Sequence, residues 1–228
     1  MLIWHCNCID GFSKLQSESI DLIVTDPPYG INYKSGHQTQ DNRSGNTKKV
    51  RDYEYFGKII NDDNLPLDWL DQAFRVLKPN KAIYIFSHWK TWGLLFNAVV
   101  DSGFKIKNMI ILNKFNWGMG DLKGSFAPKH ELLLFAAKGR HILNFEKRLP
   151  DIWNVPVFYS GAKRRHPTEK PRSWVDTPIK ASSIEGDIVL DPFAGSGSFL
   201  EHAESLGRKA MGFELDDTYP NPTYLASV

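Results

Sequence analysis

The chain carries, at residues 22–29, the stretch LIVTDPPY, in which an apolar run leads directly into two prolines. The run at 22–25 predicts a buried β-strand that ends at a turn. Each proline fixes its own φ angle and favours extended geometry in the residue before it. We therefore expect a strand followed by a stiff turn that holds Asp26, the Pro27 carbonyl and the Tyr29 ring in a set relation.

The groups in this turn suit the binding of a planar base by its exocyclic amino group. The Asp26 carboxylate and the Pro27 carbonyl have no competing local donor, so each can accept one amino hydrogen. These contacts would draw the amino nitrogen towards tetrahedral geometry and free its lone pair. The Tyr29 ring offers a face for stacking, and Pro28 belongs to the same candidate catalytic set. The alternative is an ordinary Asp-Pro-Pro turn after a strand.

A second strand-and-turn pattern lies at residues 188–199, which read IVLDPFAGSGSF. It predicts a buried strand, a tight glycine turn and a helix, at the edge of a parallel sheet where open α/β folds bind ligands. The third glycine of a pyrophosphate fingerprint is missing, so the ligand need not be a dinucleotide. The next strand ends at Glu214, about 20 residues on, which is the spacing of a carboxylate that binds ribose hydroxyls. A surface Glu is the alternative.

Together with a third stretch, HPTEKP at residues 166–171, these motifs resemble the amino-group DNA methyltransferases, in the order of that family's beta arrangement. The resemblance implies S-adenosylmethionine as cofactor, double-stranded DNA with a flipped base as substrate, and neither a metal nor a covalent intermediate. It implies cofactor contacts by Asn7, Cys8, Asp26, Thr168, Lys170, Asp191, Phe193, Gly195, Ser196, Gly197 and Glu214.

Three of these cofactor contacts have a specific expected role. Lys170 would pair with the cofactor's carboxylate, and Asp191 would receive its ammonium group. Asn7 stands where the family has an acidic residue for the cofactor's adenine, and an ordinary loop Asn is the alternative.

The resemblance favours adenine N6 as the methylated position, because Asp opens the adenine version of the first motif more often and Ser the cytosine version. The alternatives are a cytosine N4 enzyme and a truncated DNA-binding remnant with little activity. A protein glutamine methyltransferase would have Asn first and the glycine loop upstream, which is the reverse of the order in this chain.

Basic segments follow the first motif and precede the third. We expect a flexible basic loop at residues 30–66 that closes on DNA phosphates, and a target-recognition region at 114–165. Solvated loops without a role are the alternative. The candidate DNA-binding residues are Lys34, Arg43, Lys48, Lys49, Arg51, Lys114, Asn116, Trp117, Lys123, Arg164 and Arg165.

Length and composition fit one cytoplasmic domain, residues 1–228, without a signal peptide, membrane span or metal site. The net charge of +2 does not by itself announce a nucleic-acid partner. We expect a doubly wound, mostly parallel sheet of the S-adenosylmethionine-dependent methyltransferase (Rossmann-like) type, with a small antiparallel edge. Because Tyr219-Pro220-Asn221-Pro222 prevents a covering helix after the last strand, a homodimer is favoured.

Local patterns predict four further features. Helices are expected at 67–77 and 92–100, and antiparallel strands at 107–113 and 131–137. Thr177 is expected to cap a later helix, with Pro178 in its first turn. The aromatic residues expected in the core are Trp89, Trp92 and Phe96.

Overall fold

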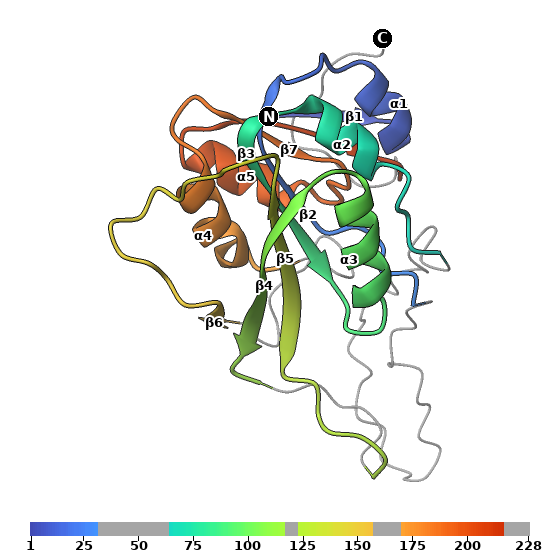
Figure 1. Cartoon of the computed structure of the whole chain (residues 1–228), viewed down its shortest axis with the longest axis vertical. Coiled ribbons are helices and arrows are strands. Elements are labelled where there is room, and N and C mark those ends of the chain that lie inside the picture. Colours follow the sequence, from blue (N-terminus) through green and yellow to red (C-terminus); the bar gives the residue numbers. More distant parts are fainter. Residues whose placement is uncertain (32–63, 117–122, 157–169, 217–228) are drawn as a thin grey trace, which may run out of the picture.

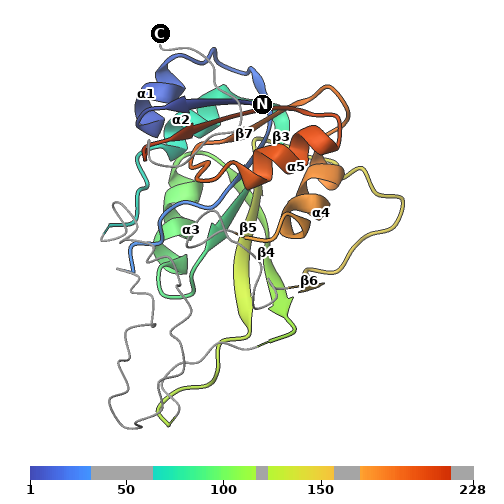
Figure 2. The same ribbon diagram turned by 180° about the vertical axis from the view of Figure 1, so that it is seen from behind.

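The computed structural model describes residues 1–31, 64–116, 123–156 and 170–216, which form a sheet of eight strands with helices on both faces (Figures 1 and 2). The other residues lie outside this description. The predicted site residues that fall among them are Lys34, Arg43, Lys48, Lys49, Arg51, Trp117, Arg164, Arg165 and Thr168, and the segment 219–222 does so too.

The elements alternate between strands and helices along most of the chain. The strands are β1 (Leu2–His5), β2 (Ile20–Thr25), β3 (Leu77–Ser87), β4 (Lys105–Lys114), β5 (His130–Ala137), β6 (Ile152–Val155), β7 (Ile188–Asp191) and β8 (Lys209–Glu214). The helices are α1 (Cys8–Ser13), α2 (Leu70–Val76), α3 (Trp92–Asp101), α4 (Ser173–Ser182) and α5 (Ser198–Ser205). No described helix is long and apolar enough to span a bilayer.

The strand order is β1-β8-β7-β2-β3-β5-β4-β6, which confirms the predicted α/β class. Among these strands β5 alone runs antiparallel to its neighbours, pairing with β3 on one side and β4 on the other. The predicted antiparallel pair is therefore present. It is followed by the short edge strand β6, which runs parallel to β4 and which the sequence pattern did not reveal.

The two faces of the sheet have separate cores because successive side chains along a strand point in opposite directions. On one face Val24 and Tyr84 pack with residues of α4 and α5. On the other face Ile23, Ile83 and Ile85 pack with residues of α1, α2 and α3. All six residues of β2 are buried, which explains why this strand reads as an almost continuous apolar run.

Helix α4 begins earlier than predicted. It starts at Ser173, so Thr177 lies within it and does not cap it, and Pro178 is an interior residue. An interior proline costs about 3 kcal/mol. The early start buries Trp174 and Val175, and burial of such side chains contributes about 1.5–3 kcal/mol each. The packing of the two side chains offsets the cost of the proline.

The prediction that three aromatic residues near α3 belong to the core holds only for Trp92, which is half-buried and packs against the core. It was wrong for Trp89, which is 62% exposed, and for Phe96, which is also exposed. The side of α3 that faces the sheet carries Leu95 and Val99, which are four residues apart and so lie on one face of the helix.

A buried hydrogen bond joins the ends of two neighbouring strands. The Thr25 hydroxyl at the end of β2 donates to Asp191 Oδ1 at the end of β7, with an oxygen–oxygen distance of 2.7 Å. Both residues are buried, and the two strands pair in parallel through Ile23 and Leu190. The bond therefore links the two segments that leave these strands.

Replacing Thr25 with Val should lower the free energy of unfolding by about 1–3 kcal/mol, because the buried Asp191 carboxyl loses a donor. Thr25→Ser keeps the hydroxyl and is the matched control, expected to unfold close to the wild type. Urea unfolding followed by circular dichroism measures both. Equal loss in the two variants would contradict a stabilising role for the hydrogen bond.

Candidate active site

The ends of three neighbouring parallel strands lie at one edge of the sheet. β8 ends at Glu214, β7 at Asp191 and β2 at Thr25, directly before Asp26. In open α/β sheets this edge is where ligands bind. The turn that holds Tyr29 and the glycine loop after β7 therefore follow adjacent strands, as the sequence predicted.

The Asp26 carboxylate accepts hydrogen bonds from two side chains, one in the same turn and one from a distant segment. The Tyr29 hydroxyl donates to Asp26 Oδ1 at 2.6 Å, and the Lys170 ammonium donates to Asp26 Oδ2 at 2.5 Å and to the Tyr29 oxygen at 3.0 Å. The expectation that Asp26 has no competing donor was wrong, because Tyr29 folds back onto it and Lys170 approaches from the segment before α4. Each oxygen of the carboxylate keeps a further lone pair for a ligand.

Lys170 fills the space beside this turn. Its side chain is only 11% exposed, and its ammonium lies 5.2 Å from the centre of the Tyr29 ring and 5.4 Å from that of Phe86. A cation at such distances is attracted by the ring faces. The structure thus pairs Lys170 with Asp26 and Tyr29, whereas its predicted contact to a cofactor carboxylate stays a prediction.

The Tyr29 ring has an aromatic neighbour that the sequence analysis missed. His88, just after β3, lies with its ring centre 6.2 Å from that of Tyr29 and at 29° to it. β3 pairs with β2 in parallel, so the end of β3 reaches the same edge of the sheet. The sequence pattern that could have indicated this neighbour is the position of His88 and Trp89 directly after a strongly apolar strand.

The glycine loop after β7 is held by Glu214. The backbone N–H of Gly195 donates to Glu214 Oε2 at 2.6 Å, and that of Asp216 donates to Oε1 at 2.8 Å. Burial raises the pKa of Glu214 above its usual value. Gly197 has a φ of +76°, and a Cβ there would lie 3.0 Å from Ile3, so both backbone angle and space favour glycine.

Asp191 lies inside the protein. It is 2% exposed, and its Oδ1 accepts hydrogen bonds from the Thr25 hydroxyl and from the backbone N–H of Phe193 at 3.0 Å. Burial raises its pKa to about 7, and the charges of Asp26 and Glu214 act in the same direction. Its predicted contact to an ammonium group stays a prediction, since the described contacts of Oδ1 are internal.

The other residues of the loop after β7 and of the segment after β1 have mainly structural contacts. Phe193 packs edge-on against Trp69, and Ser196 is buried. Asn7 caps α1, its side-chain oxygen accepting a hydrogen bond from the backbone N–H of Ile9 at 2.9 Å. This contact explains why α1 begins at Cys8. Burial raises the pKa of Cys8 to about 11, which disfavours a reactive thiolate.

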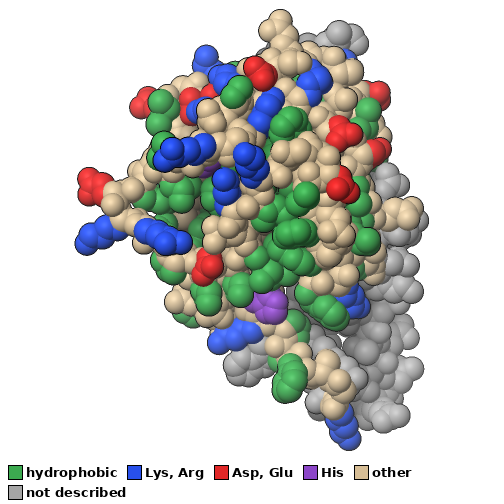
Figure 3. Space-filling view, in the orientation of Figure 1, with side chains coloured by type: hydrophobic (Ala, Val, Ile, Leu, Met, Phe, Trp, Pro, Cys, Tyr) green, Lys and Arg blue, Asp and Glu red, His purple; other side chains and the backbone are tan. Residues whose placement is uncertain are grey.

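Three of the predicted DNA-binding residues are described. Lys114 pairs with Glu131 at 2.9 Å, so its charge is largely neutralised within the protein. Asn116 and Lys123 are exposed within the segment that connects β4 and β5. The lower part of the molecule, in the orientation of Figure 1, shows Lys and Arg side chains next to apolar ones (Figure 3). In the described part of the chain, no cluster of His, Cys, Asp and Glu is suited to hold a metal ion.

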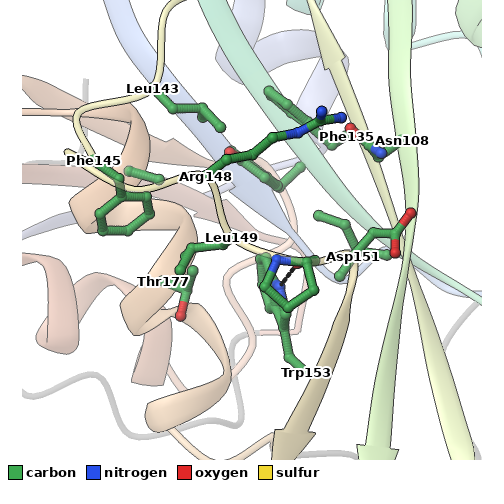
Figure 4. A pocket seen from close by; sticks show the side chains of 13 residues that line it. Asn108, Phe135, Leu143, Phe145, Arg148, Leu149, Asp151, Trp153 and Thr177 are labelled. Carbon is green, nitrogen blue, oxygen red and sulfur yellow. Dashed lines mark hydrogen bonds between the residues drawn. The ribbon is translucent and has the colours of Figure 1, made fainter.

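A separate pocket of about 440 Å³ lies between the middle of β3, β4 and β5, helix α4 and the segment before β6 (Figure 4). Its walls include Tyr84, Phe135 and Leu149, with Arg148 and Asn108 as polar members. The pocket falls within the predicted target-recognition region at 114–165 only in part. It is formed by the middle of the strands and not by their ends, so we assign it no role in the candidate active site.

Comparison with known proteins agrees with this geometry. A family model described as DNA methylase, that of the N6 and N4 amino-methyltransferases, matches residues 20–224. Type II methyltransferase M.HpaI of Haemophilus parainfluenzae is 31% identical over 234 residues, which cover 93% of this chain and 69% of the relative. Type II methyltransferase M2.DpnII of Streptococcus pneumoniae is 31% identical over 238 residues, 96% of this chain and 86% of the relative.

Solved structures share the fold. The complex of M1.HpyAVI with SAM superimposes with a TM-score of 0.68 at 23% identity and covers 96% of both chains. The cytosine-N4-specific PvuII DNA methyltransferase has a TM-score of 0.72 at 16% identity, over 95% of this chain and 82% of its own. At these identities the likeness concerns the fold.

The raised pKa of Asp191 predicts how stability depends on pH. Between about pH 4 and about pH 7 the native carboxyl keeps a proton that the unfolded chain has lost, so the free energy of unfolding falls as pH rises through this window. Asp191→Asn still accepts the hydrogen bonds at Oδ1 but does not titrate. Urea unfolding at about pH 5 and about pH 7.5 should show a smaller fall in the free energy of unfolding for the variant than for the wild type. Equal falls in the two proteins would show that Asp191 does not titrate in this window.

Proposed function

The chain belongs to the amino-group (N6/N4) DNA methyltransferase family, and we propose that it transfers a methyl group from S-adenosylmethionine to N6 of an adenine flipped out of double-stranded DNA. DNA methylation with this cofactor follows from the family, whereas the choice of adenine and the roles of single residues are our proposal. The observation that carries these roles is that the Asp26 turn and the glycine loop follow adjacent parallel strands.

The residues at the glycine loop fit the proposed cofactor. The backbone at Gly195 and Gly197 has positive φ angles. Gly195 has no side chain to block a ligand that approaches the loop, whereas the missing side chain of Gly197 makes room for Ile3. Both oxygens of Glu214 are oriented by backbone N–H groups and keep lone pairs for ribose hydroxyls. S-adenosylmethionine supplies a methyl group bound to a positively charged sulfur. The Glu214 carboxylate favours such a cationic ligand, whereas the charge of Asp26 is balanced by Lys170.

The Asp26 turn is proposed to bind the target base. One amino hydrogen is donated to the Asp26 carboxylate and the other to the Pro27 carbonyl, while the Tyr29 ring stacks on the base. Tyr29 and Lys170 fix the orientation of the carboxylate, so its position does not depend on the substrate. Asp26 orients the amino group and stabilises the positive charge that develops on nitrogen, and the proton is lost after the transfer.

Adenine is proposed over cytosine because Asp occupies the first position of the turn. The cytosine-N4 enzyme among the structural neighbours shares 16% identity and therefore informs on the fold alone. The alternatives are a cytosine N4 methyltransferase and a DNA-binding remnant with little activity. The remnant is the less favoured alternative because the Asp26 turn and the glycine loop both occupy the expected edge of the sheet.

The proposal places the enzyme in the cytoplasm, in contact with DNA. The homodimer stays a prediction. Met109 on β4 and Ile152 on the edge strand β6 have exposed apolar side chains of the kind that an interface would cover. Sedimentation velocity of the purified chain measures the oligomeric state directly.

The experiment that tests the function uses labelled S-adenosylmethionine and unmethylated plasmid DNA. After incubation, the DNA is digested to nucleosides and the labelled nucleoside is identified by chromatography. Label in N6-methyl-2′-deoxyadenosine supports the proposal, and label in N4-methyl-2′-deoxycytidine overturns the choice of adenine. Cofactor binding without any labelled nucleoside would favour the DNA-binding remnant.

Asp26→Ala should abolish methyl transfer, because the amino group loses the carboxylate that orients it. The affinity for S-adenosylmethionine, measured by calorimetry, should stay within about threefold of the wild type. Asp71→Ala on the exposed side of α2 is the control for removal of one acidic charge. Unchanged turnover in the Asp26 variant would remove this residue from the catalytic role.

Glu214→Ala should weaken the binding of S-adenosylmethionine by about 1–3 kcal/mol, the scale for loss of hydrogen bonds to a charged group. Glu146→Ala, an exposed acidic residue before β6, is the matched control. Calorimetric titration compares the two variants with the wild type. Equal affinity in all three proteins would show that the ribose binds elsewhere.

A further inference from the structure

Three aromatic rings form a continuous row from the active-site turn towards the surface. The Tyr29 and His88 ring centres are 6.2 Å apart, and those of His88 and Trp89 are 5.7 Å apart with an interplanar angle of 36°. The Lys90 ammonium lies 5.8 Å from the centre of the Trp89 ring. The row therefore ends in an exposed indole with a cation beside it.

The turn after β3 produces this arrangement. In a continued strand, His88 and Trp89 would point to opposite faces of the sheet. Here the backbone N–H of Thr91 donates to the His88 carbonyl at 3.0 Å, and that of Lys90 donates to His88 Nδ1 at 3.3 Å. These bonds turn the chain before α3 and allow the neighbouring rings to contact each other.

Exposure alone does not mark Trp89 as functional. Ile184 is an equally exposed apolar residue, at 61% against 62% for Trp89. It precedes the first residue of β7 and so lies at the amino ends of the strands, opposite the candidate active site. Single exposed apolar residues are ordinary on protein surfaces. Trp89 differs because its ring continues a row that begins at the proposed base-stacking residue, Tyr29.

A flipped base leaves its neighbours in the duplex with unstacked faces near the active site. Aromatic side chains stack on such bases irrespective of sequence, and a lysine beside them meets the phosphate backbone. The row of rings provides the aromatic side chain and Lys90 provides the lysine. The row begins at Tyr29, in the turn that holds Asp26.

We propose that Trp89 is a DNA-binding residue whose indole stacks on a base of the substrate next to the flipped nucleotide, with Lys90 at an adjacent phosphate. The proposal rests on the proposed methylation of a flipped base. It adds a residue of the segment between β3 and α3 to the substrate contacts, at a position that the sequence pattern had assigned to the core.

The test compares Trp89→Ala, Trp89→Phe and the control Ile184→Ala. Two readouts are the affinity for a fluorescent single-stranded oligonucleotide of mixed sequence, whose bases are free to stack, and the KM for unmethylated plasmid DNA. Trp89→Ala should weaken oligonucleotide binding and raise this KM, each roughly tenfold, the scale for loss of one aromatic–base stack. Trp89→Phe keeps a ring and should stay within about threefold of the wild type.

Calorimetry with S-adenosylmethionine is the third readout, and its result should be the same for the wild type and all variants. Oligonucleotide affinity that is equal in wild type and Trp89→Ala would overturn the proposal, as would equal losses in Trp89→Ala and Trp89→Phe. A loss of cofactor affinity in Trp89→Ala would also overturn it, because the residue would then act through the fold. If the wild type methylates no DNA but the affinity difference persists, the proposed function fails and the stacking contact stands.

Discussion

The buried hydrogen bond between Thr25 and Asp191 is the constraint on which the active-site geometry depends. β2 and β7 are neighbours in the sheet, but 166 residues separate the two bonded side chains along the chain. Ladder hydrogen bonds align the strands, and the side-chain bond fixes their ends, where the polar loops begin. Because both partners are buried, any shift of one loop relative to the other would leave a polar group unsatisfied.

Carboxyl groups are concentrated at this edge at an energetic cost. Asp191 is desolvated and lies in the field of Asp26 and Glu214, and its pKa of about 7 reflects both effects. Lys170 balances the charge of Asp26, which leaves Glu214 as the carboxylate that favours a cationic ligand. The proposed methyl donor is cationic at sulfur. The electrostatics of the edge thus suit the cofactor that the family uses.

The aromatic residues at the ends of β2 and β3 connect the chemistry to the substrate surface. Tyr29 takes part in the Asp26 network through its hydroxyl and contacts His88 through its ring. One residue therefore contributes to both the polar and the stacking parts of the site. The backbone turn before α3 extends the stacking part outwards to Trp89.

The amino-acid sequence by itself determined the α/β class, the family and the two loops, because apolar runs followed by Pro or Gly turns are local signals that do not depend on distant contacts. It did not reveal that Lys170 pairs with Asp26, that Asp191 is turned inward, or that Trp89 is exposed. Those features were decided by the tertiary structure. The Lys170–Asp26 pair and the burial of Asp191 depend on strand order, and the exposure of Trp89 depends on the turn between β3 and α3. Contacts between residues more than 100 positions apart leave no periodic pattern along the chain.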